Sequence, residues 1–110
     1  MPYINVSEGI SRLMNEKKFY FQLLKNFDGK KFSDGIVKSI KENDYKTVAV
    51  AAHTLKGVAA NLSLSYLWDL AKDLELQAKL TNDISGFADK IEDATVKTLE
   101  AITKLLDSQN

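Results

Sequence analysis

The 110-residue sequence contains no cysteine, one proline and one histidine. The absence of cysteine excludes disulfide bonds and thiolate chemistry. Because the proline stands at position 2 and there are only five glycines, long helices are not interrupted. Val, Ile and Thr do not cluster in alternating runs, so the sequence gives little support for strands.

Neither sign of charge is in excess, since Lys and Arg total 15 and Asp and Glu also total 15. A general nucleic-acid binder needs a basic surplus for phosphate contacts, so we expect no nucleic-acid partner. No apolar run approaches the roughly 20 residues of a membrane span. The first residues lack the charged and apolar regions of a signal peptide. We therefore expect a cytoplasmic protein without a membrane partner.

Apolar residues recur at the spacing of amphipathic helices along most of the chain. Asn15 and Ser65 are the expected N-caps of the second and fifth helices, and Asp28 is expected to end the second. Long helices joined by short loops indicate an all-α fold, an antiparallel up-and-down four-helix bundle with a short additional N-terminal helix. We expect one domain over residues 1–110. The pattern predicts helices over residues 7–14, 15–27, 32–42, 45–62, 65–78 and 86–106.

His53 lies near the middle of the fourth predicted helix. Successive residues of a helix turn by about 100°. On that geometry, six apolar residues lie within about 60° of the side opposite His53. They are Val48, Ala51, Leu55, Val58, Ala59 and Leu62. The helical phase therefore predicts that the imidazole lies at the middle of the outward face.

The residues around His53 on that face are mostly small. Gly57 costs a helix roughly 1 kcal/mol relative to Ala, which favours a need for close approach, although a merely tolerated glycine is the alternative. Lys56 can reach the space around the imidazole from three residues away, although a solvated surface lysine is the alternative. We expect a partner to bind at a docking patch made of Lys46, Ala49, Val50, Lys56, Gly57 and Ala60.

Histidine chemistry suits phosphoryl transfer at this position. An ordinary histidine has a pKa of about 6.5, so a neutral nucleophilic nitrogen is available at cellular pH. One ammonium group at about 4–5 Å would stabilise each negative charge of a phosphoryl group by roughly 1–4 kcal/mol. The sequence has no phosphate-binding glycine loop, so a partner must supply the rest of the catalysis. These features predict a phosphocarrier rather than a kinase.

The pentapeptide His53-Thr54-Leu55-Lys56-Gly57, preceded by Ala52, resembles the signature of the histidine-containing phosphotransfer (HPt) domain family. The resemblance covers most of residues 4–80, whereas the last helix is similar only in pattern. The family often has a second glycine six residues after the first, where this chain has Ser63. We expect Ser63 to fall where the helix ends. The other similar segments are residues 24–27, 43–45, 51–53, 60–62 and 67–75.

The resemblance implies a four-helix bundle that shuttles phosphoryl groups between receiver domains in multistep phosphorelays of two-component systems. It implies that His53 is phosphorylated, that Lys56 contacts the phosphoryl oxygens and that Gly57 leaves room for the receiver domain. The chain would bind no cofactor itself, and Mg²⁺ would belong to the acidic site of the receiver domain. The expected partners of this monomer are response-regulator receiver domains and a hybrid histidine kinase.

Other roles for a lone histidine fit less well. A zinc-type metal site is poorly supported, because the sequence has one histidine and no cysteine. A ferritin-like carboxylate site would require Glu three residues before the histidine, where this chain has Val50. Composition does not exclude a Ser–His–Asp triad, but a bundle without a strained nucleophile turn disfavours it. The main alternative is a non-catalytic HPt-like helical adaptor that binds a signalling partner without carrying phosphate. The presence of both His53 and Lys56 disfavours the adaptor.

Overall fold

The computed structural model describes residues 2–109, and every regular element in that range is a helix. The predicted all-α fold class is therefore confirmed. None of these helices combines the length and the apolar composition that crossing a membrane requires. The helices are α1 (Val6–Arg12), α2 (Lys17–Lys25), α3 (Gly29–Lys41), α4 (Tyr45–Leu62), α5 (Ser65–Lys79) and α6 (Phe87–Asp107).

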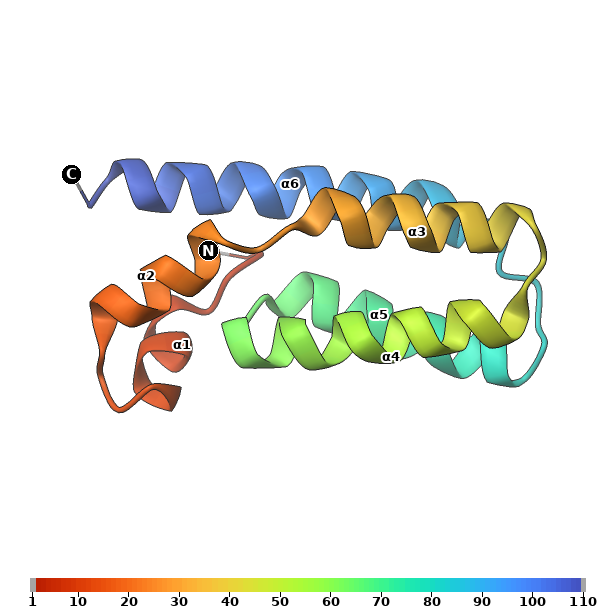
Figure 1. Ribbon diagram of the computed structural model, residues 1–110, viewed down its shortest axis with the longest axis horizontal. Coiled ribbons are helices and arrows are strands. Elements are labelled where there is room, and N and C mark those ends of the chain that lie inside the picture. The colour runs from red at the N-terminus through yellow and green to blue at the C-terminus, as the bar shows by residue number, and fades with distance from the viewer. Residues whose placement is uncertain (1, 110) are drawn as a thin grey trace.

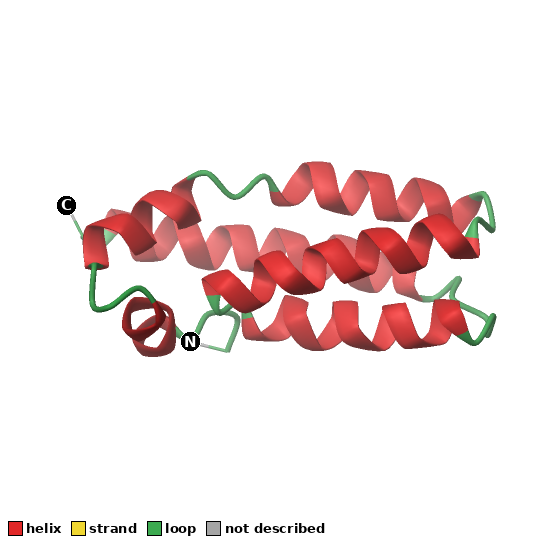
Figure 2. Cartoon of the chain, turned by 60° about the horizontal axis from the view of Figure 1, so that its bottom comes forward, coloured by secondary structure: helices red, strands yellow, loops and turns green. Residues whose placement is uncertain are grey.

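The four longer helices, α3 to α6, form an antiparallel up-and-down bundle (Figure 1). Each runs opposite to the helix before it, and α3 and α5 each contact both α4 and α6. The short helices α1 and α2 lie at one end of the bundle, where α6 extends past α4 and α5 (Figures 1 and 2). The expected N-terminal addition to the bundle thus consists of two short helices.

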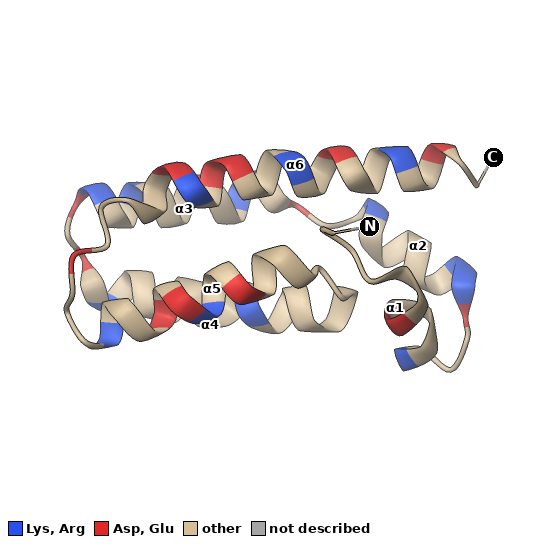
Figure 3. Cartoon of the chain, turned by 180° about the vertical axis from the view of Figure 1, so that it is seen from behind, with Lys and Arg blue, Asp and Glu red and all other residues tan. Residues whose placement is uncertain are grey.

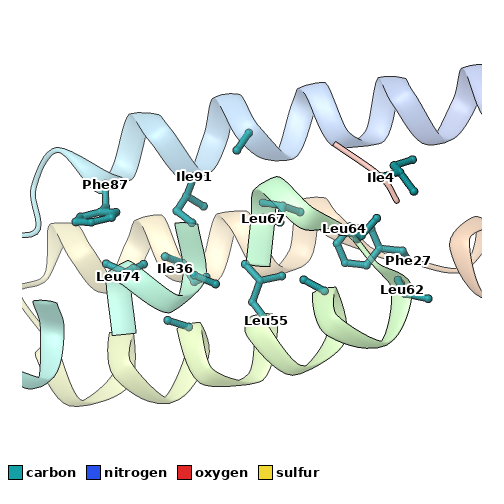
Figure 4. Packing of buried hydrophobic residues seen from close by; sticks show 14 of the residues in the cluster. Ile4, Phe27, Ile36, Leu55, Leu62, Leu64, Leu67, Leu74, Phe87 and Ile91 are labelled. Carbon is teal, nitrogen blue, oxygen red and sulfur yellow. The ribbon is translucent and has the colours of Figure 1, made fainter. Parts of the chain in front are cut away.

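The bundle buries a cluster of apolar side chains between its helices (Figure 4). Ile36 of α3, Leu55 of α4, Leu67 and Leu74 of α5 and Ile91 of α6 are each at most 1% exposed. Full burial of one such side chain stabilises the fold by about 1.5–3 kcal/mol. Because α4 and α5 both turn their apolar sides to this core, the directions of their polar sides are fixed as well.

The helix that carries His53 begins and ends where the sequence predicts, at Tyr45 and Leu62. Its N-cap is Asp44, whose side chain accepts a hydrogen bond from the backbone N–H of Thr47 at 3.1 Å. A cap of this kind satisfies a backbone donor of the first turn and contributes about 1 kcal/mol. The position of His53 within α4 therefore follows from local signals.

Several predictions at other helix ends are wrong, and the third helix begins at Gly29 rather than at residue 32. Asn15 is not the N-cap of α2, because it adopts a left-handed φ of 65° and the helix begins two residues later. Asp28 does not end α2, since its side chain caps α3 by accepting a hydrogen bond from a backbone N–H of the first turn. Ser65 is already the first residue of α5, because the buried Leu64 takes the N-cap position.

Hydrogen bonds at the turn after α4 connect the N-terminal segment and helices to the bundle. Ser63 adopts the left-handed conformation that favours glycine, with φ of 54°. Its hydroxyl donates a hydrogen bond to the carboxylate of Glu8 at 3.0 Å, and its carbonyl accepts one from the N–H of Asn5 at 2.8 Å. The buried hydroxyl of Tyr20 donates to the carbonyl of Leu62 at 2.7 Å, and burial raises the pKa of this phenol to about 12.

Candidate functional site

His53 lies in the middle of α4 with its side chain 69% exposed, so the imidazole faces solvent as the helical phase predicts. Ala51 and Val58, which we expected in the buried stripe, are only half-buried because they line an open groove. Ala52 is buried in their place. The buried residues of α4 are Val48, Ala52, Leu55, Ala59 and Leu62.

A carboxylate from the neighbouring helix contacts the imidazole. Oε2 of Glu75, on α5, lies 3.0 Å from Nδ1 of His53, and only 7% of the Glu75 side chain is exposed. An ionised carboxylate can only accept hydrogen bonds, so in the neutral ring Nδ1 carries the proton and Nε2 keeps its lone pair. The contact thus favours the tautomer in which Nε2 is the nucleophilic nitrogen.

Sequence reasoning missed Glu75 as a site residue, although a signal was present. Glu75 occupies a position in the buried stripe of α5, next to Leu74 and within one turn of Ala71 and Ala78. A charged side chain at such a position is seldom buried without a partner of opposite charge. An acidic residue inside an apolar stripe therefore indicates a buried ion pair, and the remaining question is which cation it meets.

Two lysines from two helices contact Glu75. Nζ of Lys56, on α4, lies 2.7 Å from Oε1, and Nζ of Lys79, one turn further along α5, lies 2.9 Å from Oε2. The hydrogen bond from Lys56, followed by that from Lys79, lowers the pKa of Glu75 to about 2, although burial acts in the opposite direction. Figure 3 shows acidic and basic residues side by side along α5 and α4. We call Glu75, Lys56 and Lys79 the Glu75 cluster.

The other residues of the predicted docking patch lie along the same side of α4 as the imidazole. Gly57 is exposed, and a Cβ atom at this position would meet nothing within 4 Å. Ala49 and Ala60 are half-buried, Lys46 is exposed and Val50 is 62% exposed. The space above the imidazole is therefore open to another molecule.

The site offers no ligand set for a metal ion. Within residues 2–109, no three His, Cys, Asp or Glu side chains come together as a metal site would require. His53 and Glu75 do meet, but the other partners of Glu75 are ammonium groups, which have no lone pair for a cation. Mg²⁺ in the acidic site of a partner stays a prediction.

The Hpt domain family model matches residues 28–108 of the chain. The chain belongs to the Hpt domain family. Comparisons with curated proteins and with solved structures give no match. Membership supports a role in a phosphotransfer relay, and Hpt domains in general are phosphocarriers without catalytic activity of their own. The matched range contains α3 to α6 and the whole site around His53, whereas α1 and α2 precede it.

An apolar groove of about 700 Å³ lies beside the docking patch of this Hpt domain. Helix α4 contributes Thr54 and Val58 to the groove, α3 contributes Phe32 and Gly35, and α2 contributes Leu23. Thr54 directly follows the histidine, so the groove begins one residue away from the imidazole. The Glu75 cluster lies on the opposite side, where α5 packs. The imidazole thus lies between an apolar groove and a charged cluster.

Proposed function

We propose that this Hpt domain is a phosphocarrier of a multistep phosphorelay. His53 accepts a phosphoryl group from an aspartate of one receiver domain and passes it to an aspartate of another. The observation that carries this proposal is the exposed imidazole whose Nδ1 is held by Glu75, because that contact leaves Nε2 as the nucleophile. The sequence contains no other histidine that could take this role.

The transfer exchanges one phosphorus bond for another. The lone pair of Nε2 attacks phosphorus in line, an N–P bond forms, and the P–O bond to the aspartate breaks. The electron pair of that bond leaves with the aspartate as a carboxylate. The proton on Nδ1 stays in place, so the ring becomes cationic as the phosphoryl group arrives. The carboxylate of Glu75, 3.0 Å away, stabilises this cation.

Lys56 supplies positive charge for the phosphoryl oxygens. It lies three residues after His53 on the same side of α4, and its side chain is 28% exposed. At about 4–5 Å, an ammonium group stabilises a unit negative charge by roughly 1–4 kcal/mol for effective dielectric constants between about 80 and 20. Lys56 can therefore tune the equilibrium between phosphoaspartate and phosphohistidine. The receiver domain, with Mg²⁺ in its acidic site, supplies the remaining catalysis.

The receiver domain binds over the docking patch. In-line transfer requires the reacting atoms to approach within about 3–3.5 Å, so bulk near the imidazole would prevent it. Gly57 and Ala60 have small side chains, so the surface of α4 beside the histidine leaves space for the receiver domain. The apolar groove beyond Thr54 can bury apolar side chains of the partner. Val50 adds an exposed apolar side chain on the same helix.

The test is phosphoryl transfer from a receiver domain that has been charged with labelled acetyl phosphate in the presence of Mg²⁺. We expect acid-labile, alkali-stable label on the wild-type chain and none on His53→Gln. The matched control is Lys104→Gln, which changes an exposed residue of α6, away from the docking patch and the groove, and keeps the label. A wild-type chain that binds the receiver as tightly as His53→Gln but takes up no label would replace this proposal with the adaptor function.

A further inference from the structure

A second lysine lies beside the proposed phosphoacceptor. Nζ of Lys79 contacts Oε2 of Glu75 at 2.9 Å, and this is the same oxygen that Nδ1 of His53 contacts at 3.0 Å. The ammonium group and the imidazole nitrogen are therefore no more than about 6 Å apart. Lys56 contacts the other carboxylate oxygen, Oε1, at 2.7 Å. Lys79 is thus linked to the ring through a single shared atom.

The Glu75 cluster carries a positive surplus before phosphorylation, because two ammonium groups face one carboxylate. Asp69 and Asp73 line the same shallow groove, but both lysines form their ion pairs with Glu75. One lysine is sufficient to neutralise a single buried carboxylate. The second positive charge is therefore available to an anion that binds beside the imidazole.

We propose that Lys79 is the second cation of the phosphohistidine site. Glu75 holds it beside His53 in the unphosphorylated protein, and it turns to the phosphoryl oxygens once the group is on Nε2. This inference rests on the proposed function, because it requires a phosphoryl group on His53. Lys79 has the freedom to turn, since its side chain is 63% exposed, against 28% for Lys56, and its four-carbon stem is flexible.

Phosphorylation itself releases Lys79 from Glu75. The neutral ring, which is the form that can attack phosphorus, offers the carboxylate only an uncharged N–H group. Once Nε2 bears the phosphoryl group, the ring keeps its Nδ1 proton, becomes cationic and pairs with Glu75 directly. The buried carboxylate then stays compensated when one ammonium group leaves it. The cationic ring and the dianionic phosphoryl group together carry one negative charge, which the surplus ammonium group neutralises.

The test uses the full chain, phosphorylated on His53 by phosphoramidate, so that it needs no receiver domain. A ³¹P NMR titration measures the pKa of the phosphoryl group in wild type, Lys79→Gln and Lys79→Arg. The matched control is Lys72→Gln, because Lys72 lines the same groove but lies over the ring of Trp68. Loss of a cation favours the protonated phosphoryl group. Lys79→Gln therefore raises that pKa by about 0.3–0.7, a two- to fivefold effect typical of an exposed ion pair.

Lys79→Arg and Lys72→Gln should titrate like the wild type. The inference fails if Lys79→Gln titrates like Lys72→Gln, or if Lys79→Arg does not restore the wild-type value. A purely structural role would instead change the tautomer of the unphosphorylated ring, seen by ¹⁵N NMR, and leave the phosphoryl pKa unchanged, which also overturns the inference. Failure of the proposed function appears separately, as no transfer from a charged receiver domain to the wild-type chain.

Discussion

Replacing Glu75 with glutamine removes the negative charge beside the imidazole and keeps the size of the side chain. The glutamine amide can accept a hydrogen bond from Nδ1, but it can also turn and donate one, so the tautomer is no longer fixed. A hydrogen bond to a charged group contributes about 1.5–3 kcal/mol, against about 0.5–1.5 kcal/mol for a neutral one. Glu75→Gln therefore removes about 1 kcal/mol of preference for the Nδ1–H tautomer.

The transfer rate should respond to the same substitution, because the ring becomes cationic while the N–P bond forms. A loss of about 1 kcal/mol from the transition state corresponds to a rate about fivefold lower. The 69% exposure of the imidazole, which lets water replace part of the lost interaction, keeps the effect near this value. We expect Glu75→Gln to accept phosphoryl groups about fivefold more slowly and to show both tautomers in long-range ¹H–¹⁵N NMR spectra.

The matched control for Glu75→Gln is Asp73→Asn, which removes a charge from the exposed side of α5 where the carboxylate accepts a hydrogen bond from Gln77. This control should leave both the tautomer and the transfer rate at wild-type values. If Glu75→Gln also keeps a single tautomer and the wild-type rate, Glu75 does not orient the nucleophile, and the reasoning is refuted.

The same carboxylate should make the stability of the fold depend on acid pH. The pKa of Glu75 is lowered from 4.5 to about 2, chiefly by the hydrogen bond from Lys56. Because the pKa is lower in the folded state, this contribution to stability is complete above about pH 4.5 and is lost as the pH falls towards about 2. The melting temperature should fall more steeply across this window for wild type than for Glu75→Gln, and parallel curves would contradict the linkage.

Three further substitutions test the site and its support. Lys56→Ala should slow phosphoryl acceptance or shorten the lifetime of phosphohistidine several-fold, and an unchanged rate and lifetime would remove Lys56 from the site. Gly57→Leu should melt nearly as the wild type does, since nothing lies within 4 Å of an added Cβ, but it should block transfer; normal transfer would defeat the steric argument. Gly9→Ala should destabilise the fold by about 1–3 kcal/mol, because the methyl group would collide with the ring of Tyr20, and urea denaturation with an unchanged midpoint would show that α1 shifts freely.

The helix that bears the site could be predicted because its signals are local. Asp44 can cap only the helix that begins directly after it, and the apolar period from Val48 to Leu62 fixes which side of that helix enters the core. The outward direction of His53 is then a consequence of helical geometry alone. The directions of Gly57 and Lys56 are set in the same way, since both share that helix.

Glu75 and Lys79 could not be placed by the same means, because their contacts depend on how α5 is rotated against α4. No local pattern links His53 to a residue 22 positions away. The cap of α5 was missed for a related reason. A serine cap contributes about 1 kcal/mol, whereas burial of a leucine contributes about 1.5–3 kcal/mol. Packing therefore decides the start of α5, and the buried Leu64 takes the position expected for Ser65.

Two glycines inside helices are not explained by packing within the chain. At Gly35 of α3 and Gly57 of α4, a Cβ atom would meet nothing within 4 Å. Alanine would therefore fit at either position and stabilise its helix by about 0.5–1 kcal/mol. Gly57 lies one turn after His53, and Gly35 lines the apolar groove that begins at Thr54. Both helices are thus less stable than they would be with alanine. At Gly57 a larger side chain would obstruct the approach of the proposed partner to the imidazole, and at Gly35 it would obstruct the groove.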